Sequence, residues 1–261
     1  MKKKNIILNS LIAIFLAVAL FSGYKLFGIH KEAEKSADDF EHLQQITEEK
    51  DENGNATYSS SEEKYASVYE KNNDFVAWIN IPETPLNYPV VQTKNSPEYY
   101  LHKDFEGNYS AYGVPFMDHK DTVDVSDNII VYGHNMTNKT MFSAIESYAD
   151  KNYWKEHKYI GFDTMNGFGT YEVVVSFRIN TRDTNFYYSE ITDFANANEF
   201  NNYINNAKAL ATYDTGVSAS YGDKLLTLST CEYTYPDGAG RYVLIAKKIS
   251  NEDITQMNIA E

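Results

Sequence analysis

Cysteine is nearly absent from this sequence: its 261 residues contain a single one, at position 231. A lone thiol excludes an internal disulfide. Two interpretations of Cys231 are left, an inert side chain packed as a small hydrophobe or a reactive thiol. The neighbours of this residue decide between them.

Positive charge is also scarce. The 23 Lys and Arg are outnumbered by 37 Asp and Glu, which gives a net charge of −14 and a sequence pI near 4.9. Nucleic-acid binders need a basic face, so we expect no nucleic-acid partner. Hydrophobic residues make up 43% of the chain and aromatics 15%, with 22 Tyr and 14 Phe. This is a globular composition, rich in the aromatic residues that suit strands.

No long apolar run is free of interruption. The stretch from Ile6 to Phe27 is broken by polar residues and a glycine, and its strongest part, Leu11 to Phe21, has 11 residues. This core suits a signal peptide better than a full span of about 20 residues, with Ala17-Val18-Ala19 as the candidate cleavage site. The whole stretch equally suits an uncleaved signal anchor. We expect residues 1–30 to anchor the chain in the membrane, with the bulk of the chain outside the cell.

The charge runs of the chain lie in residues 31–74. Apolar residues at helical spacing around Leu43 predict a short amphipathic helix, and a second is expected around Glu62–Asn72. Between them, Asn53–Ser61 is interpreted as a linker. We therefore interpret residues 31–74 as a helical stalk.

From Phe75 onward the sequence changes to short β-rich runs divided by turn residues. Eight short strands favour a barrel or a sandwich. Two longer segments are interpreted as helical, Asn138–Tyr153 and Phe194–Ala211. The expected strands are Ala77–Ile81, Tyr88–Gln92, Val114–Met117, Asn128–Tyr132, Lys158–Phe162, Tyr171–Arg178, Lys224–Ser229 and Tyr242–Lys248.

The last two expected strands are apolar at both alternating sets of positions, which predicts burial on both faces in the barrel wall. Cys231 follows the first of these strands, and Arg241 opens the second. A hairpin with a loop from Glu232 to Gly240 would bring both residues to the same end of the barrel.

A catalytic cysteine needs a base, a nearby positive charge, or both, because a free thiol with a pKa near 8.5 is only about 3% ionised at pH 7. Among six histidines, His134 differs because it follows the apolar run Ile129–Tyr132 and a glycine. It would emerge at the end of a buried strand, where catalytic groups usually sit. His102 and His157 are interpreted as solvated surface residues, and His119 is ambiguous. On this pattern alone a structural role for His134 stays open.

These motifs resemble those of the sortases. The pentapeptide Thr227–Cys231, with Arg241 ten residues after the cysteine, is similar to the cysteine signature of that family, and Tyr132-Gly133-His134 is similar to its histidine motif. The resemblance covers roughly Phe75–Ile249 and is closest to class B. The segments that match class B are Phe116-Met117-Asp118, Thr140-Met141-Phe142 and a long insertion with a helix at about Asn180–Asp223.

The resemblance implies a mainly β fold. It predicts a closed eight-stranded barrel of the sortase type, with N-terminal helices and a helix in the long insertion between strands six and seven. Residues 75–261 would form the catalytic domain. No cofactor is implied and no metal either, since one cysteine and scattered histidines offer no plausible ligand cluster.

The resemblance also implies an activity. Sortases cleave a short sorting motif near the carboxyl end of secreted proteins, after its Thr, and transfer the acyl group to a cell-wall peptidoglycan amine. Cys231 would attack the Thr carbonyl and hold the acyl group as a thioester. His134 would protonate the departing amine and deprotonate the incoming one. Arg241 would stabilise the tetrahedral oxyanion.

The same resemblance assigns a substrate groove and partners. The partners are secreted proteins with an xPxTx-type sorting motif, a peptidoglycan amine and the membrane. The Asn135-Met136 pair after the histidine departs from the motif and has no interpretation at this level. Ordinary packing or surface exposure is the alternative for each candidate groove residue; these are Leu101, Tyr132, Tyr187, Tyr188, Ser229, Thr230 and Glu232.

Two other functions stay open. A cysteine peptidase would release the same acyl group to water, because the outcome depends on which nucleophile reaches the thioester. A non-enzymatic, anchored surface-binding module would instead carry Cys231 as an inert thiol.

Overall fold

The chain forms two compact units, Met1–His42 and Leu43–Glu261. The residues that the computed structural model describes are 2–48, 58–182, 185–235 and 238–250.

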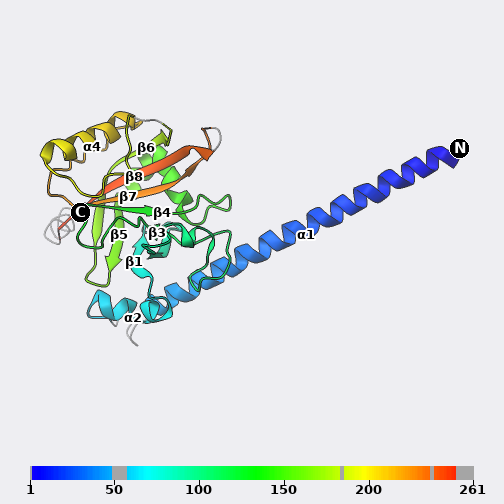
Figure 1. Ribbon diagram of the computed structural model, residues 1–261, viewed down its shortest axis with the longest axis horizontal. Coiled ribbons are helices and arrows are strands. Elements are labelled where there is room, and N and C mark those ends of the chain that lie inside the picture. Colours follow the sequence, from blue (N-terminus) through cyan, green and yellow to red (C-terminus); the bar gives the residue numbers. More distant parts are fainter. Residues whose placement is uncertain (1, 49–57, 183–184, 236–237, 251–261) are drawn as a thin grey trace. The chain divides into compact units, whose positions relative to one another are not determined.

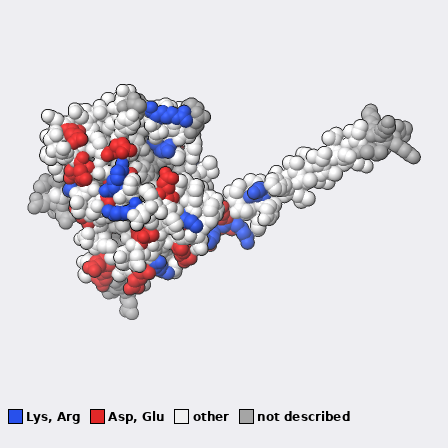
Figure 2. Space-filling model, in the orientation of Figure 1, with Lys and Arg blue, Asp and Glu red and all other residues white. Residues whose placement is uncertain are grey.

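The first unit consists of most of a long helix, α1 (Lys2–Thr47), whose last residues belong to the second unit. Among the helices of the described residues, only this one is long enough and apolar enough to cross a membrane. Its most apolar window has a mean hydropathy of 2.1, and no residue of that window is buried. Figure 2 shows few charged side chains along it. These properties are consistent with a membrane anchor or a signal sequence. The helix continues through residue 30, so the expected anchor and the start of the expected stalk form one element.

The second helix expected for the stalk is present. α2 (Ser61–Lys71) begins after Ser60, whose side chain accepts a hydrogen bond from the backbone amide of Glu63. Such a cap satisfies one of the amides that a helix leaves unpaired at its start. Of the expected linker Asn53–Ser61, only residues 58–61 lie within the described part of the chain.

Eight strands close into one barrel in the order β1-β2-β3-β4-β7-β8-β6-β5 (Figure 1). The pairs β2–β3 and β4–β7 are parallel, and the other pairs are antiparallel. The expected closed eight-stranded barrel is thus confirmed, and each strand overlaps its predicted range. The strands are β1 (Phe75–Asn80), β2 (Asn87–Val91), β3 (Phe116–Met117), β4 (Asn128–Tyr132), β5 (Tyr159–Thr164), β6 (Thr170–Asn180), β7 (Leu225–Glu232) and β8 (Gly240–Lys248).

The last two strands lie in the middle of the barrel wall, as the apolar runs predicted. β7 pairs with β4 and β8, and β8 pairs with β7 and β6. Leu226, Leu228, Val243 and Ile245 are all fully buried. Val243 and Ile245 also belong to an apolar cluster that includes residues of the insertion, such as Tyr203. Both faces of these strands are therefore covered.

The insertion between β6 and β7 contains the expected helix. α4 (Ala197–Leu210) begins after Asn196, whose side chain accepts hydrogen bonds from two backbone amides of the first turn. In Figure 1, α4 covers the barrel beside β6, and the contacts between these two elements agree. Its buried face consists of Phe200, Tyr203, Ile204 and Ala207.

The segment expected to be helical over Asn138–Tyr153 is divided in two. It forms a 3₁₀ helix, η2 (Phe142–Ala149), followed by α3 (Lys151–Glu156). Asp150 separates them: its backbone is extended, and its side chain accepts a hydrogen bond from the Asn152 amide to start α3. A residue that prefers to cap a helix interrupts the apolar pattern here.

Candidate active site

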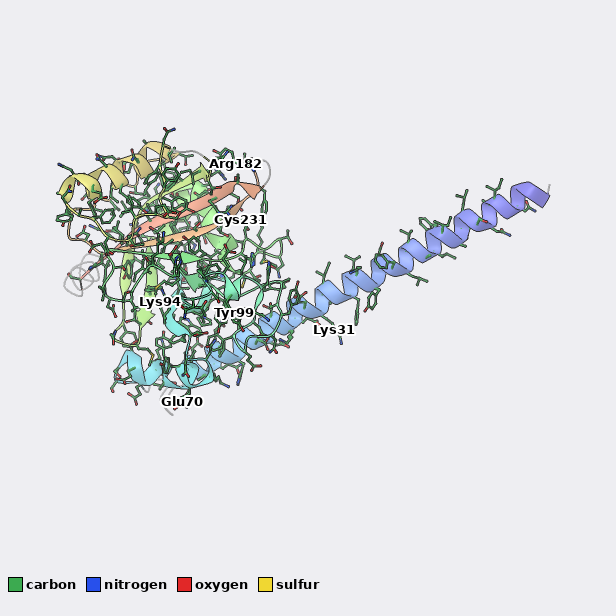
Figure 3. All side chains as sticks on the ribbon, in the orientation of Figure 1. Lys31, Glu70, Lys94, Tyr99, Arg182 and Cys231 are labelled. Carbon is green, nitrogen blue, oxygen red and sulfur yellow. The ribbon has the colours of Figure 1, made fainter. Side chains whose placement is uncertain are left out.

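The hairpin of β7 and β8 places Cys231 beside Arg241. The two residues are register partners across this antiparallel pair, and Figure 3 shows Cys231 toward one end of the sheet. Opposed side chains in such a pair have Cβ atoms about 4.5–5.5 Å apart. The thiol is free and partly exposed. The side chain of Arg241 therefore begins next to a thiol that solutes can reach.

The guanidinium of Arg241 is held by the backbone of the hairpin. Its Nη1 donates hydrogen bonds to the carbonyl oxygens of Gly238 and Gly240, both at 2.8 Å. A side chain at position 240 would collide with the backbone carbonyl of Glu232. The close approach of the two strands at the base of the loop thus requires a glycine.

His134 follows β4, which lies parallel to β7. Because parallel strands end at the same edge, β4 delivers His134 to the edge where Cys231 lies. The turn starts at Gly133, whose amide donates to the Ser229 carbonyl at 3.2 Å. A Cβ on Gly133 would come within 2.5 Å of the Phe142 ring, so this position also requires glycine.

The imidazole of His134 is oriented by a backbone carbonyl. Its Nε2 lies 2.7 Å from the Leu101 oxygen, in the 3₁₀ helix η1 (Tyr99–His102). A carbonyl can only accept, so Nε2 carries the proton. The ring of His102 stacks on it, with centroids 5.5 Å apart. Burial lowers the pKa of His134, the Leu101 contact partly opposes this, and His102 lowers it further. The neutral imidazole is therefore favoured.

One cavity of about 480 Å³ brings these residues together. His134, Cys231 and Arg241 all line it, with side chains from β3, β4, β7, β8, the turn before η1 and the insertion. The lining residues are Pro97, Glu98, Leu101, Phe116, Asp118, His119, Lys120, Tyr132, Gly133, His134, Thr181, Tyr188, Ser189, Glu190, Ser229, Thr230, Cys231 and Arg241.

Two tyrosines build the walls of this cleft. Tyr188, from the insertion, shares a 2.8 Å hydrogen bond between its hydroxyl and that of Ser229. Tyr132, at the end of β4, donates to Asp118 Oδ2 at 2.9 Å. Burial raises the pKa of both phenols. Both stay protonated at physiological pH and can donate hydrogen bonds.

Five of the seven predicted groove residues line the cleft: Leu101, Tyr132, Tyr188, Ser229 and Thr230. The other two lie elsewhere. Tyr187 is 51% exposed and outside the lining. Glu232 is 3% exposed, and its carboxylate accepts from Arg178 Nε at 3.3 Å and from the Thr234 amide at 2.9 Å. In this structure Glu232 fixes the hairpin.

The remaining lining residues were missed by sequence reasoning. His119, left ambiguous, lines the cleft and lies 3.3 Å from Asp118 Oδ1. Glu98 and Lys120 come from connections whose sequence carries no periodic pattern. Asp118 belongs to a segment that matches the class B sortases, but nothing in that segment indicated that it lines a cleft. His102 is exposed, as expected, yet it contacts His134.

Side chains that could bind a metal ion are scattered in the fold. Over the described ranges, no three or more His, Cys, Asp or Glu side chains are grouped so that they could hold a metal ion.

Known proteins are similar to this chain in sequence and in fold. The family model described as a sortase domain matches residues 79–249. Sortase B of Listeria monocytogenes is 31% identical over 257 residues, which cover 96% of this chain and 100% of that protein.

Two solved structures superpose well. A Staphylococcus aureus sortase B–substrate complex has a TM-score of 0.75 and 30% identity, over 85% of this chain and 99% of that one. A sortase B complexed with triglycine has a TM-score of 0.75 and 30% identity, over 84% and 99%. The family match spans more than half of the chain, and the relatives are matched over nearly their full length. The chain therefore belongs to the sortase family, as a cysteine transpeptidase of the sortase B class.

Proposed function

We propose that this enzyme cleaves an xPxTx-type sorting motif near the carboxyl end of secreted proteins, after its Thr, and joins the protein to a peptidoglycan amine. The observation that carries the proposal is the single cleft lined by Cys231, His134 and Arg241. The two similar structures, a substrate complex and a triglycine complex, agree with a peptide donor and an amine acceptor.

In the first step the proton of the Cys231 thiol passes to His134, and the resulting thiolate attacks the Thr carbonyl carbon and forms a carbon–sulfur bond. The tetrahedral intermediate collapses, the scissile carbon–nitrogen bond breaks, and the imidazolium of His134 gives its proton to the leaving amine. Burial lowers the pKa of His134, so this proton is given up readily. The product is a thioester on Cys231.

In the second step an acceptor amine attacks the thioester carbonyl. The now neutral His134 takes a proton from this amine, the carbon–sulfur bond breaks, and Cys231 leaves as the thiolate. A new amide joins the two substrates, and the enzyme returns to its starting state.

Arg241 stabilises the oxyanion in both steps. It is the register partner of Cys231 and lines the same cleft. Removing one good oxyanion donor costs roughly 3–4 kcal/mol of transition-state stabilisation in other enzymes. Leu101, Tyr132, Tyr188, Ser229 and Thr230 form the walls that bind the sorting motif.

The N-terminal part places this chemistry at the cell surface. Residues 1–30 serve as an uncleaved membrane anchor, 31–74 as a stalk and 75–261 as the catalytic domain. The long apolar helix supports this assignment, and a cleaved signal sequence is the alternative. Membrane fractionation of cells that express the full chain distinguishes them: an uncleaved anchor keeps the full-length chain in the membrane, whereas a cleaved signal sequence releases a shorter chain.

Mass spectrometry of the purified protein with a library of xPxTx peptides, with and without hydroxylamine, tests the function. The expected product is the Thr hydroxamate, and Cys231→Ala should give none. Free acid formed in preference to hydroxamate would indicate a cysteine peptidase. Slow alkylation of Cys231 by iodoacetamide, together with the absence of any cleavage, would favour a surface-binding module.

A further inference from the structure

The carbonyl group of Cys231 lies just beyond the end of the neighbouring strand. β4 pairs with β7 as far as Tyr132 and Ser229, and the Gly133 amide extends this ladder onto the Ser229 carbonyl. Carbonyls two residues apart on a strand point to the same side. The Cys231 carbonyl therefore points toward β4, at a level where β4 has already ended and offers no backbone amide.

A side chain supplies the missing donor. Asn135 Nδ2 donates to the Cys231 carbonyl oxygen at 2.9 Å. Its second amide hydrogen goes to Glu146 Oε2, in η2, at 3.0 Å. A carbonyl oxygen and a carboxylate oxygen both accept hydrogen bonds, so the amide has one favourable orientation. Glu146 thereby keeps Asn135 directed at the backbone of Cys231.

A second cross-link lies on the other side of His134. Thr230 Oγ1 donates to the Gly133 carbonyl oxygen at 2.7 Å. His134 thus sits between two residues that are each tied to β7, Gly133 through Thr230 and Asn135 through Cys231. The backbone of the histidine turn is held against the strand that carries the thiol.

We infer that Asn135, oriented by Glu146, is a positioning residue that sets the separation between the imidazole of His134 and the thiol of Cys231. Asn135 does not line the cleft, so its effect passes through these two residues and not through substrate contact. Proton transfer by His134 requires hydrogen-bond reach throughout the reaction, and misplacement by about 1 Å can cost about 10²-fold in rate. This inference rests on the proposed function for its rate measurement.

Steady-state kinetics on one cleaved peptide tests the inference. Asn135→Ala should lower kcat by roughly 10–100-fold with KM within about twofold of wild type, since only the transition-state geometry changes. Asn135→Asp should do no better, because a carboxylate cannot donate to the Cys231 carbonyl and would face Glu146. Glu146→Ala should lower kcat in the same way, and Glu146→Gln should recover most of that loss because it keeps an acceptor oxygen.

Asn138→Ala is the matched control. It removes an amide from the same loop, where Asn138 Nδ2 donates to the Tyr112 hydroxyl at 3.2 Å. This variant should retain wild-type kcat. A kcat for both Asn135→Ala and Glu146→Ala within about threefold of Asn138→Ala would overturn the inference. So would a raised KM at unchanged kcat.

Alkylation of Cys231 by iodoacetamide, without peptide, separates this inference from the function. The pH profile of alkylation in Asn135→Ala should shift toward that of His134→Ala, whereas Asn138→Ala should follow wild type. If no peptide is cleaved but this shift is present, the function fails and the positioning role stands. An unshifted profile in Asn135→Ala and in Glu146→Ala would refute the positioning role.

Discussion

Arg241 and Cys231 are ten residues apart in the sequence, but register makes them neighbours. The guanidinium donates from one nitrogen to two hairpin carbonyls, which fixes its position at the cleft. The planar guanidinium of arginine can keep these bonds and still present other N–H groups in fixed directions. The ammonium group of a lysine is a point charge and lacks this arrangement.

The first prediction follows from this geometry. Arg241→Lys should lower kcat by roughly 10²–10³ with little change in KM, nearly as much as Arg241→Ala, because aligned donors are lost although the charge is kept. Steady-state kinetics on one peptide measures this. Arg178→Lys, which changes an arginine of β6 outside the cleft lining, is the control. A kcat for Arg241→Lys within about fivefold of wild type would show that Arg241 acts through its charge alone.

The second prediction concerns pH. Activity should follow a bell-shaped profile that belongs to the coupled pair of His134 and Cys231. Burial lowers the pKa of His134, so the acid limb should lie below the ordinary histidine value of about 6.5. His134→Ala should lose several orders of magnitude in rate, and His157→Ala, whose ring contacts the Pro82 carbonyl, should not. A rate that rises monotonically to pH 10 would contradict a general-acid role for His134.

At the scale of elements, η1 and the chain before β3 support the histidine. Gly113 has φ of +60°, and a Cβ there would lie 2.6 Å from the Leu101 carbonyl oxygen and 2.7 Å from that of Tyr100. The Leu101 carbonyl is the group that orients His134. The backbone of this connection is therefore packed directly against the carbonyl that orients His134.

Gly113→Ala is the third prediction. It should reduce stability by about 1–3 kcal/mol through the left-handed conformation and the clash, and reduce kcat by at least about tenfold because the Leu101 carbonyl must move. Gly216→Ala is matched, since Gly216 has φ of +78° with open space around its Cβ position. It should lose stability but keep its kcat. Thermal melting and kinetics compare the two; equal kcat values would contradict a link from Gly113 to His134.

The insertion reaches the cleft through a short segment. Thr181, Tyr188, Ser189 and Glu190 line the cleft, whereas the buried face of α4 packs on the barrel. We therefore expect the segment that precedes α4, and not the helix itself, to contact a substrate bound in the cleft. A loop in contact with a groove is well placed to determine specificity.

At the scale of the whole molecule, we expect one carboxyl group to make the stability of the fold depend on pH. Asp121 is fully buried. Its Oδ2 accepts from the Ile130 amide at 2.6 Å, and its Oδ1 has no hydrogen-bond partner within the described part of the chain. Burial raises the pKa of Asp121 to about 7; the Ile130 amide and Lys120 oppose this, and the nearby Asp118 and Asp193 add to it.

The fourth prediction is a stability that falls with pH through this group. Between about pH 4 and pH 7 the native state binds a proton that the unfolded chain has lost, so the free energy of unfolding decreases as pH rises and levels off above about 7. Through Asp121, the free energy of unfolding should fall by about 2–4 kcal/mol between pH 4 and pH 8. Asp121→Asn resembles the protonated form, so this decrease should be absent from the variant. Urea unfolding of both proteins at several pH values measures the difference. Parallel curves would show that Asp121 is ionised in the native state.

The local sequence pattern alone determined where the strands and helices lie, but it left a barrel and a sandwich open; the closed barrel was implied by the resemblance to the sortases. Strand ranges, the helix in the insertion and the burial of β7 and β8 follow from the alternation and length of apolar runs, which are properties of neighbouring residues. The pattern also placed Cys231, Arg241 and His134 at strand ends, but it left a structural role for His134 open, and the resemblance to the sortases supplied the roles expected for all three residues. The division into η2 and α3 was missed, because the single capping residue between them hardly changes the apolar pattern of the whole segment.

Only the tertiary structure decided what surrounds those three residues. The parallel pairing of β4 with β7 brought Asn135 to the Cys231 carbonyl, and no spacing along the chain indicates a contact across 96 residues. Barrel closure brought together cleft residues from connections far apart in the sequence. It also directed Glu232, which was predicted to line the groove, toward Arg178. The physical reason is that periodicity sets which face a side chain takes, whereas its partner depends on the register of strands that are not adjacent in the chain.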